Sequence, residues 1–86
     1  MKRVISTRVV RDTLTNSYNE RAEAEAYAVA TGNQELAAQM RECLNTIQDI
    51  VHELFNARDY RLIHVQKNMG GVEIRPFIMV WNEEKA

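Results

Sequence analysis

Residues 60–81 of the 86-residue chain read YRLIHVQKNMGGVEIRPFIMVW. Two runs rich in β-branched and aromatic residues, 60–67 and 72–81, flank a Gly-Gly dipeptide. This pattern is typical of an antiparallel β-hairpin. Pro76 has no N–H group to donate to a neighbouring strand, so we expect the second strand to lie at a sheet edge or to be bulged there.

The segment before this hairpin predicts two helices. Over 34–57, apolar residues recur at alternating spacings of three and four, typical of a helix packed along another helix: Leu36, Met40, Cys43, Ile47, Ile50 and Leu54. Residues 17–31 are rich in alanine and glutamate, which are good helix formers. Gly32 and Asn33 suit the junction, because glycine ends helices and asparagine caps their starts. One continuous helix through Gly32 is the alternative.

Residues 3–11 contain four β-branched apolar residues and predict a third strand. The order of elements then predicts a two-layer α+β fold, β-αα-ββ, in which a helical hairpin covers one face of a three-stranded, mainly antiparallel sheet. We expect a single small domain over 1–86, with 82–86 as a tail. The order of the strands stays open.

The charge balance is even overall but uneven along the chain. The sequence has 11 Lys+Arg and 12 Asp+Glu, a formal net charge of −1. Residues 1–11 carry four basic residues and no acid, whereas 12–57 carry eight acids and two arginines. The longest strongly apolar run, 77–81, is far shorter than the roughly 20 residues that span a bilayer. With a single cysteine and no secretory signal, the sequence predicts a cytoplasmic protein without membrane contact.

Strand alternation divides the side chains of 72–81 between two faces. Val72, Ile74, Ile78 and Val80 share one parity and are expected to meet the helices. Large apolar side chains of the other parity would lie on the open face and, with two residues of the preceding strand, form an interface: Phe77, Met79, Trp81, Tyr60 and His64. A shift at Pro76, or cover by the tail, would remove this surface.

Nucleic-acid binding is an alternative function. Basic residues that the predicted sheet would present are Arg3, Arg8, Arg11, Arg61, Lys67 and Arg75. The predicted helices form an acidic face that could mimic a nucleic-acid backbone: Glu20, Glu23, Glu35, Glu42, Asp49 and Glu53. The near-neutral charge and the lack of a nucleic-acid-binding motif weigh against direct binding.

No catalytic, metal or cofactor site is expected. His52 and His64 have no partner at metal-ligand spacing or in a recognisable triad, and Cys43 lies on the apolar stripe of its helix. The predicted order of elements resembles that of small messenger-cleaving toxins, which leaves a nuclease with His64, Lys67 and Arg75 as an option. The sequence predicts a non-enzymatic interaction module that inhibits or adapts a larger protein, forms homodimers and serves a phage or mobile element as an accessory protein.

Overall fold

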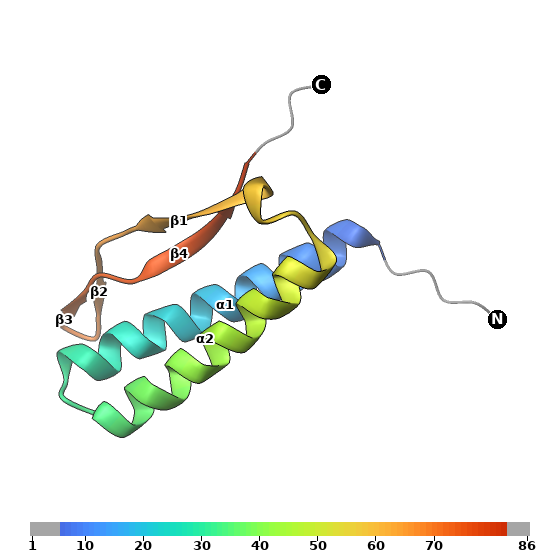
Figure 1. The fold of residues 1–86 in the computed structure, drawn as a ribbon. Helices are drawn as coiled ribbons and strands as arrows, with labels where there is room; N and C mark the ends of the chain where they lie inside the picture. Colours follow the sequence, from blue (N-terminus) through green and yellow to red (C-terminus); the bar gives the residue numbers. More distant parts are fainter. Residues whose placement is uncertain (1–5, 83–86) are drawn as a thin grey trace.

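The computed structural model describes residues 6–82, in which two long helices form a hairpin covered on one side by a twisted β-ribbon (Figure 1). The helices are α1 (Thr7–Ala30) and α2 (Gln34–Leu54), followed by a short 3-10 helix, η1 (Ala57–Asp59). The strands are β1 (Tyr60–His64), β2 (Lys67–Met69), β3 (Val72–Ile74) and β4 (Phe77–Trp81). Two helices packed against antiparallel strands confirm the predicted α+β class.

The predicted strand over 3–11 is wrong for 7–11, which form the first turns of α1. Residues 3–5 lie outside the described part of the chain. The Ser6 hydroxyl caps the helix by accepting a hydrogen bond from the N–H of Arg8 at 3.2 Å. Tertiary contacts from the far end of the chain outweigh the β preference of this segment, because α1 packs against β4.

The predicted break between the two helices is confirmed. Gly32 has a φ of 78°, a left-handed conformation that glycine adopts without a steric penalty. The Asn33 side chain then caps α2 by accepting a hydrogen bond from the N–H of Leu36 at 3.1 Å. The second helix ends at Leu54, three residues before the expected end.

The predicted hairpin is confirmed as one ribbon in a single register. The β2–β3 turn contains Gly70 and Gly71, both with positive φ, as a tight two-residue turn requires. Asn68 supports the turn by accepting a hydrogen bond from the N–H of Gly71 at 3.0 Å. The described strands form two antiparallel pairs, β1–β4 and β2–β3, instead of one three-stranded sheet.

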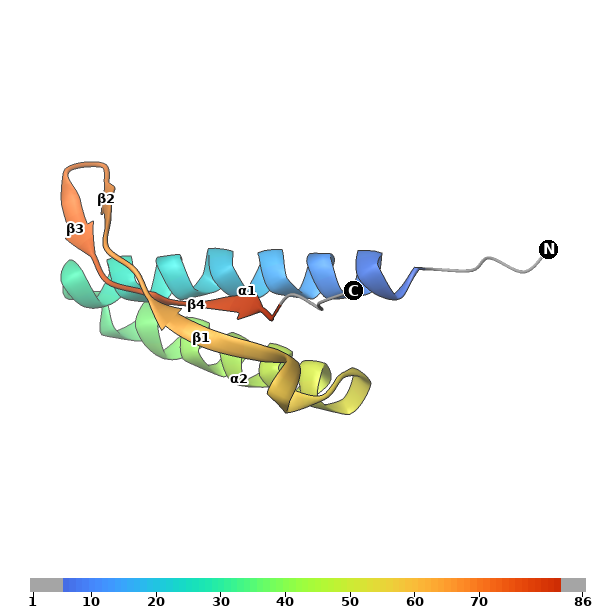
Figure 2. The same cartoon turned by 90° about the horizontal axis from the view of Figure 1, so that it is seen from above.

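The ribbon changes its orientation at Pro76. The N–H of Val65 donates to the carbonyl of Pro76 at 3.0 Å, but Pro76 has no N–H to return the bond. Strand structure is interrupted there, and Figure 2 shows the β2–β3 tip turned away from the direction of β1 and β4. Ile74 and Met79 are both buried although they differ in parity. The side of the ribbon that meets the helices therefore changes between β3 and β4.

The main core lies where β4 and the start of β1 cross the helical hairpin. Seven buried residues from both helices and both strands form its central cluster: Tyr18, Ala22, Leu44, Ile47, Val51, Tyr60 and Met79. Such a small core is expected for a short chain, which buries a low fraction of its surface on folding. The strands lie mainly over α1, while β1 reaches across toward α2 (Figure 2).

Candidate protein-binding surface

The predicted interface residues do not form one open face. Met79 is 1% exposed and Tyr60 is also buried, whereas Phe77 and His64 are exposed. Their predicted placement on an open face is wrong for Met79, Tyr60 and Trp81, because the ribbon turns at Pro76 and these side chains point to the helices. Strand alternation then places Ile78 and Val80, which were expected inside, on the outer side of the ribbon.

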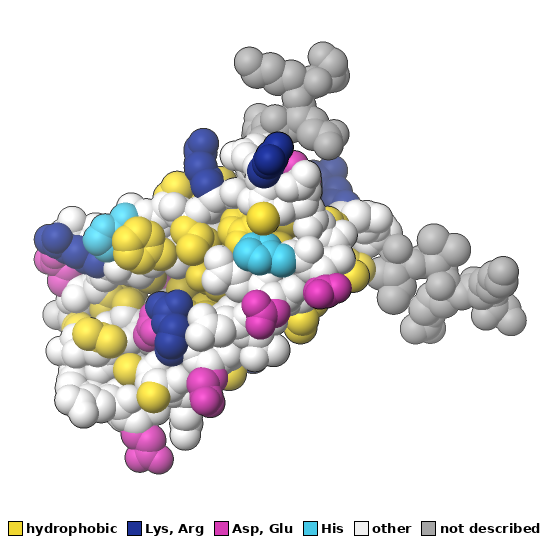
Figure 3. Space-filling view, viewed as in Figure 1, with side chains coloured by type: hydrophobic (Ala, Val, Ile, Leu, Met, Phe, Trp, Pro, Cys, Tyr) yellow, Lys and Arg dark blue, Asp and Glu magenta, His cyan; other side chains and the backbone are white. Residues whose placement is uncertain are grey.

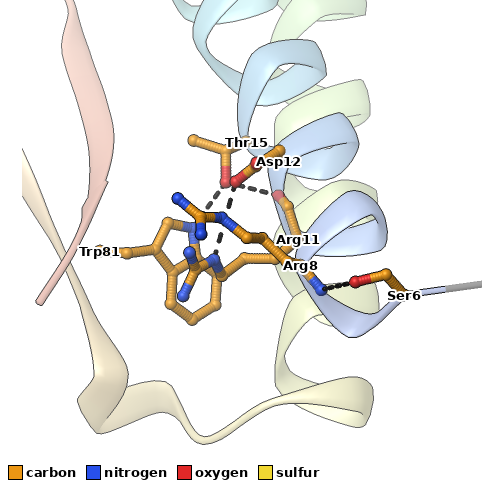
Figure 4. A network of polar contacts seen from close by, with 6 residues as sticks. All are labelled: Ser6, Arg8, Arg11, Asp12, Thr15 and Trp81. Atoms are coloured by element: carbon orange, nitrogen blue, oxygen red, sulfur yellow. Dashed lines mark hydrogen bonds and ion pairs between the residues drawn. The ribbon is translucent and has the colours of Figure 1, made fainter. Parts of the chain in front are cut away.

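Trp81 connects β4 to the start of α1. Its Nε1–H donates to Thr15 Oγ1 at 2.6 Å, and the Thr15 hydroxyl donates to the carbonyl of Arg11 at 2.7 Å. The Arg11 guanidinium lies over the indole ring, 5.3 Å from its centre. Figure 4 shows these residues together with the helix cap at Ser6. The edge of Phe55 also packs against the indole. Trp81 is therefore half-buried and connects the end of β4 to α1 and to Phe55.

Tyr60 joins the start of β1 to α2. Its hydroxyl accepts a hydrogen bond from Gln48 Nε2 at 3.0 Å and lies 2.5 Å from His52 Nε2. The His52 ring also stacks on the tyrosine ring, with 5.7 Å between the ring centres. These contacts close the space between β1 and α2 at this end of the strand.

At the other end of β1 the same space opens into a groove of about 510 Å³ between the ribbon and the helices. Its apolar lining comes from α1, α2 and the ribbon: Tyr18, Ala22, Ala26, Val29, Ala30, Leu44, Leu62, Ile74, Pro76 and Phe77. Figure 3 shows hydrophobic side chains gathered on this side of the molecule, between the strands and the helices. We call this surface the ribbon groove.

Three large apolar side chains of the ribbon groove remain exposed. Val29 is 67%, Phe77 53% and Leu62 37% exposed. The Phe77 ring stacks on His64 with 4.4 Å between the ring centres, and His64 Nε2 is 2.9 Å from the carbonyl oxygen of Arg75. These contacts orient Phe77 before any partner binds. Of the three residues, only Phe77 was a predicted site residue.

An ion pair between Arg41 of α2 and Glu25 of α1 borders the ribbon groove. Arg41 Nε donates to Glu25 at 2.7 Å, and its NH2 group contacts the other carboxylate oxygen at 2.5 Å. This hydrogen bonding raises the pKa of the Arg41 guanidinium. Burial raises the pKa of the neighbouring Tyr18 hydroxyl, and the positive charge of Arg41 partly opposes this rise. The tyrosine is thus neutral wherever the protein is folded near neutral pH.

The predicted nucleic-acid residues do not gather on one surface. Arg8 and Arg11 lie on the first turns of α1, and Arg61 lies on the outer side of β1. Near the other end of the molecule, Lys67 pairs with Glu23 at 2.7 Å and Arg75 with Glu73 at 3.3 Å. Arg3 lies outside the described residues. The basic side chains near the ribbon groove are therefore neutralised by adjacent acids.

The predicted acidic face is concentrated on α2. Glu23 and Glu25 are ion-paired, and Glu20 is exposed on α1. Exposed α2 acids without an ion pair to any other residue within 6–82 are Glu35, Glu42, Asp49 and Glu53. The only basic side chain of α2, that of Arg41, is bound to Glu25. The exposed surface of α2 is therefore strongly negative.

Three other features of residues 6–82 bear on function: possible metal ligands, the cysteine, and the length and apolarity of the helices. Within 6–82, no three His, Cys, Asp or Glu side chains converge as metal ligands would. Cys43 is half-buried on α2. Neither described helix is both long and apolar enough to cross a membrane.

Comparisons with known proteins identify no relative. No family model matches the chain, and neither the curated proteins nor the solved structures include a significant match.

Proposed function

We propose that this protein is a non-enzymatic protein–protein interaction module that acts as an inhibitor or adaptor of a larger protein through its ribbon groove. The main support for this proposal is that Val29, Leu62 and Phe77 are exposed around one concave apolar surface. Exposed apolar clusters of this kind mark sites of association, and aromatic residues are enriched at the centres of interfaces.

The geometry of Phe77 supports this function. About half of its side chain is exposed, so a partner could cover roughly 100 Å² of apolar surface there, worth about 2.5 kcal/mol. Stacking on His64 already fixes the ring, which reduces the entropy lost on binding. The nucleic-acid alternative has weaker support, because Lys67 and Arg75 near the groove are paired with acids.

Self-association is the second part of the proposal. Ile50 and Leu54 are exposed on α2, where they continue the apolar stripe that includes Cys43 and Ile47. A homodimer that buried this stripe would add apolar contacts to a small core. Light scattering on a sizing column would then give a dimer mass for the wild type and a monomer mass for Leu54→Glu. A wild-type monomer at all concentrations would contradict this part.

A capture experiment tests the ribbon groove. The proteins retained from a cell lysate would be compared between immobilised wild-type protein and the groove variants Phe77→Ala and Leu62→Ala. The control is Val9→Ala, which truncates an exposed apolar side chain on the first turn of α1. We expect proteins retained by the wild type and the control to be lost from both groove variants. Equal retention by all four proteins, or retention by none, would contradict the proposed function.

A further inference from the structure

The two outer edges of the β1–β4 pair differ. At the outer edge of β4, the Asn19 side chain accepts a hydrogen bond from the N–H of Met79 at 2.7 Å and donates one to its carbonyl at 3.2 Å. This side-chain amide occupies the position that the main chain of another strand would take. The centre of the β4 edge is therefore closed by α1.

The outer edge of β1 carries no such cover. Main-chain bonds continue the β1–β4 pairing at both ends, Asn82 N–H to the Asp59 carbonyl at 2.8 Å and Val65 N–H to the Pro76 carbonyl at 3.0 Å. Hydrogen-bonded pairs alternate along an antiparallel ladder, so Arg61 and Ile63 bond to β4. The intervening residues direct their main-chain N–H and C=O groups outward: Tyr60, Leu62 and His64.

These outward groups form no hydrogen bond with any other residue in 6–82. They present three donors and three acceptors at the spacing of a strand, beside the mouth of the ribbon groove. A strand that paired with this edge would place every second side chain on the helix side of the ribbon, where Leu62 borders the groove. Main-chain bonds and apolar burial would then act together, as in peptide recognition by strand addition.

The charge of α2 indicates the chemistry of the added strand. Glu42, Asp49 and Glu53 are exposed on the helix that lies below the β1 edge and have no ion pair within the described chain. A basic segment would complement this surface. A second copy of the chain fits less well as the added strand, because its own β1 (Tyr60–His64) carries a single arginine to pair with these acids.

We propose that β1 accepts an extended, basic segment of a partner protein as an added strand, an inference that rests on the proposed function. At each of the two positions opposite Leu62 and His64, the segment carries a large apolar side chain that enters the ribbon groove. Opposite Tyr60, where Gln48 and His52 close the groove, it carries Lys or Arg directed toward Asp49.

Selection of random displayed 12-residue peptides on the immobilised wild-type protein tests this inference. We expect the selected peptides to carry apolar or basic residues at every second position, with residues of other kinds between them. Leu62→Pro removes an outward N–H that β4 does not use. It should weaken peptide binding about tenfold, as expected for the loss of one hydrogen bond. Leu62→Val keeps that N–H and should change the affinity less than about threefold.

Two further measurements test strand addition even if the Leu62→Pro variant fails to fold. N-methylation of the peptide at alternate residues should abolish binding to wild-type protein in one register and leave it intact in the other, because only every second amide faces β1. Asp49→Asn combined with Glu53→Gln should weaken binding and flatten its salt dependence.

The outcomes separate this inference from the proposed function. Peptides that need Phe77 but bind equally well after N-methylation in either register would overturn strand addition and leave the ribbon groove as a binding site. Selection of acidic peptides would overturn the inferred partner chemistry. If no selected peptide depends on Phe77, both the inference and the proposed function fail.

Discussion

Asn19 offers the sharpest test of how the ribbon is attached to the helices. Asn19→Ala removes both hydrogen bonds between the α1 side chain and the main chain of Met79. Each such bond contributes about 0.5–1.5 kcal/mol net, giving about 1–3 kcal/mol together. Alanine recovers about 0.5 kcal/mol through its better helix propensity. The expected loss in the free energy of unfolding is therefore about 0.5–2.5 kcal/mol.

Urea denaturation followed by circular dichroism would measure this loss. The matched control is Asn16→Ala, which makes the same replacement at an exposed α1 position whose side chain bonds to no residue within 6–82. The control should be unchanged or slightly more stable, and Asn19→Ala should also melt several degrees lower, since 1 kcal/mol corresponds to about 4–8 °C in a domain of this size. Equal stability of the two variants would refute the role assigned to Asn19.

Three further predictions concern other parts of the fold. Met79→Ala should lower the free energy of unfolding by about 2–5 kcal/mol and Phe77→Ala by less than about 1 kcal/mol, as measured by urea titration, because only Met79 is buried; the reverse order would place Phe77 in the core. Burial raises the pKa of Tyr18, so its contribution to stability is complete below pH of about 10 and is lost as the pH rises through the higher folded-state value. Unfolding midpoints measured across this range should fall less in Tyr18→Phe than in the wild type, and parallel curves would contradict the assignment. Gly71→Ala should cost about 1 kcal/mol or more in chemical denaturation, because Gly71 has a φ of 87°; an unchanged midpoint would argue against the tight turn.

The predictable parts of the fold are those set by neighbouring residues. The paired glycines of the turn and the Gly32-Asn33 junction require particular backbone conformations, and the structure has both features at the predicted places. The apolar stripe of α2 likewise follows from helical periodicity alone. The start of α1 was missed because Val9 and Val10 favour a strand locally. The spacing of Val10, Leu14 and Tyr18, four residues apart, was the available sign of a helix.

The candidate site was only partly predictable. Phe77 and His64 were both predicted to lie on an exposed surface, and the structure places them opposite each other in the hairpin. Alternation could not reveal that Met79 and Trp81 turn inward, since their direction depends on how the ribbon twists at Pro76. Leu62 and Val29 gave no sign of a shared surface, because they lie on separate elements.

Residues within a few positions of one another specify the helix break, the hairpin and the acidic character of α2, and the α+β class follows from the order of these elements. Which face of β4 meets the helices depends instead on the tertiary structure, as do the closure of one ribbon edge by Asn19 and the apolar groove beside the β1 edge. These features depend on the twist and docking of the whole ribbon, where contacts between residues about 60 positions apart, such as Asn19 with Met79, outweigh local preference.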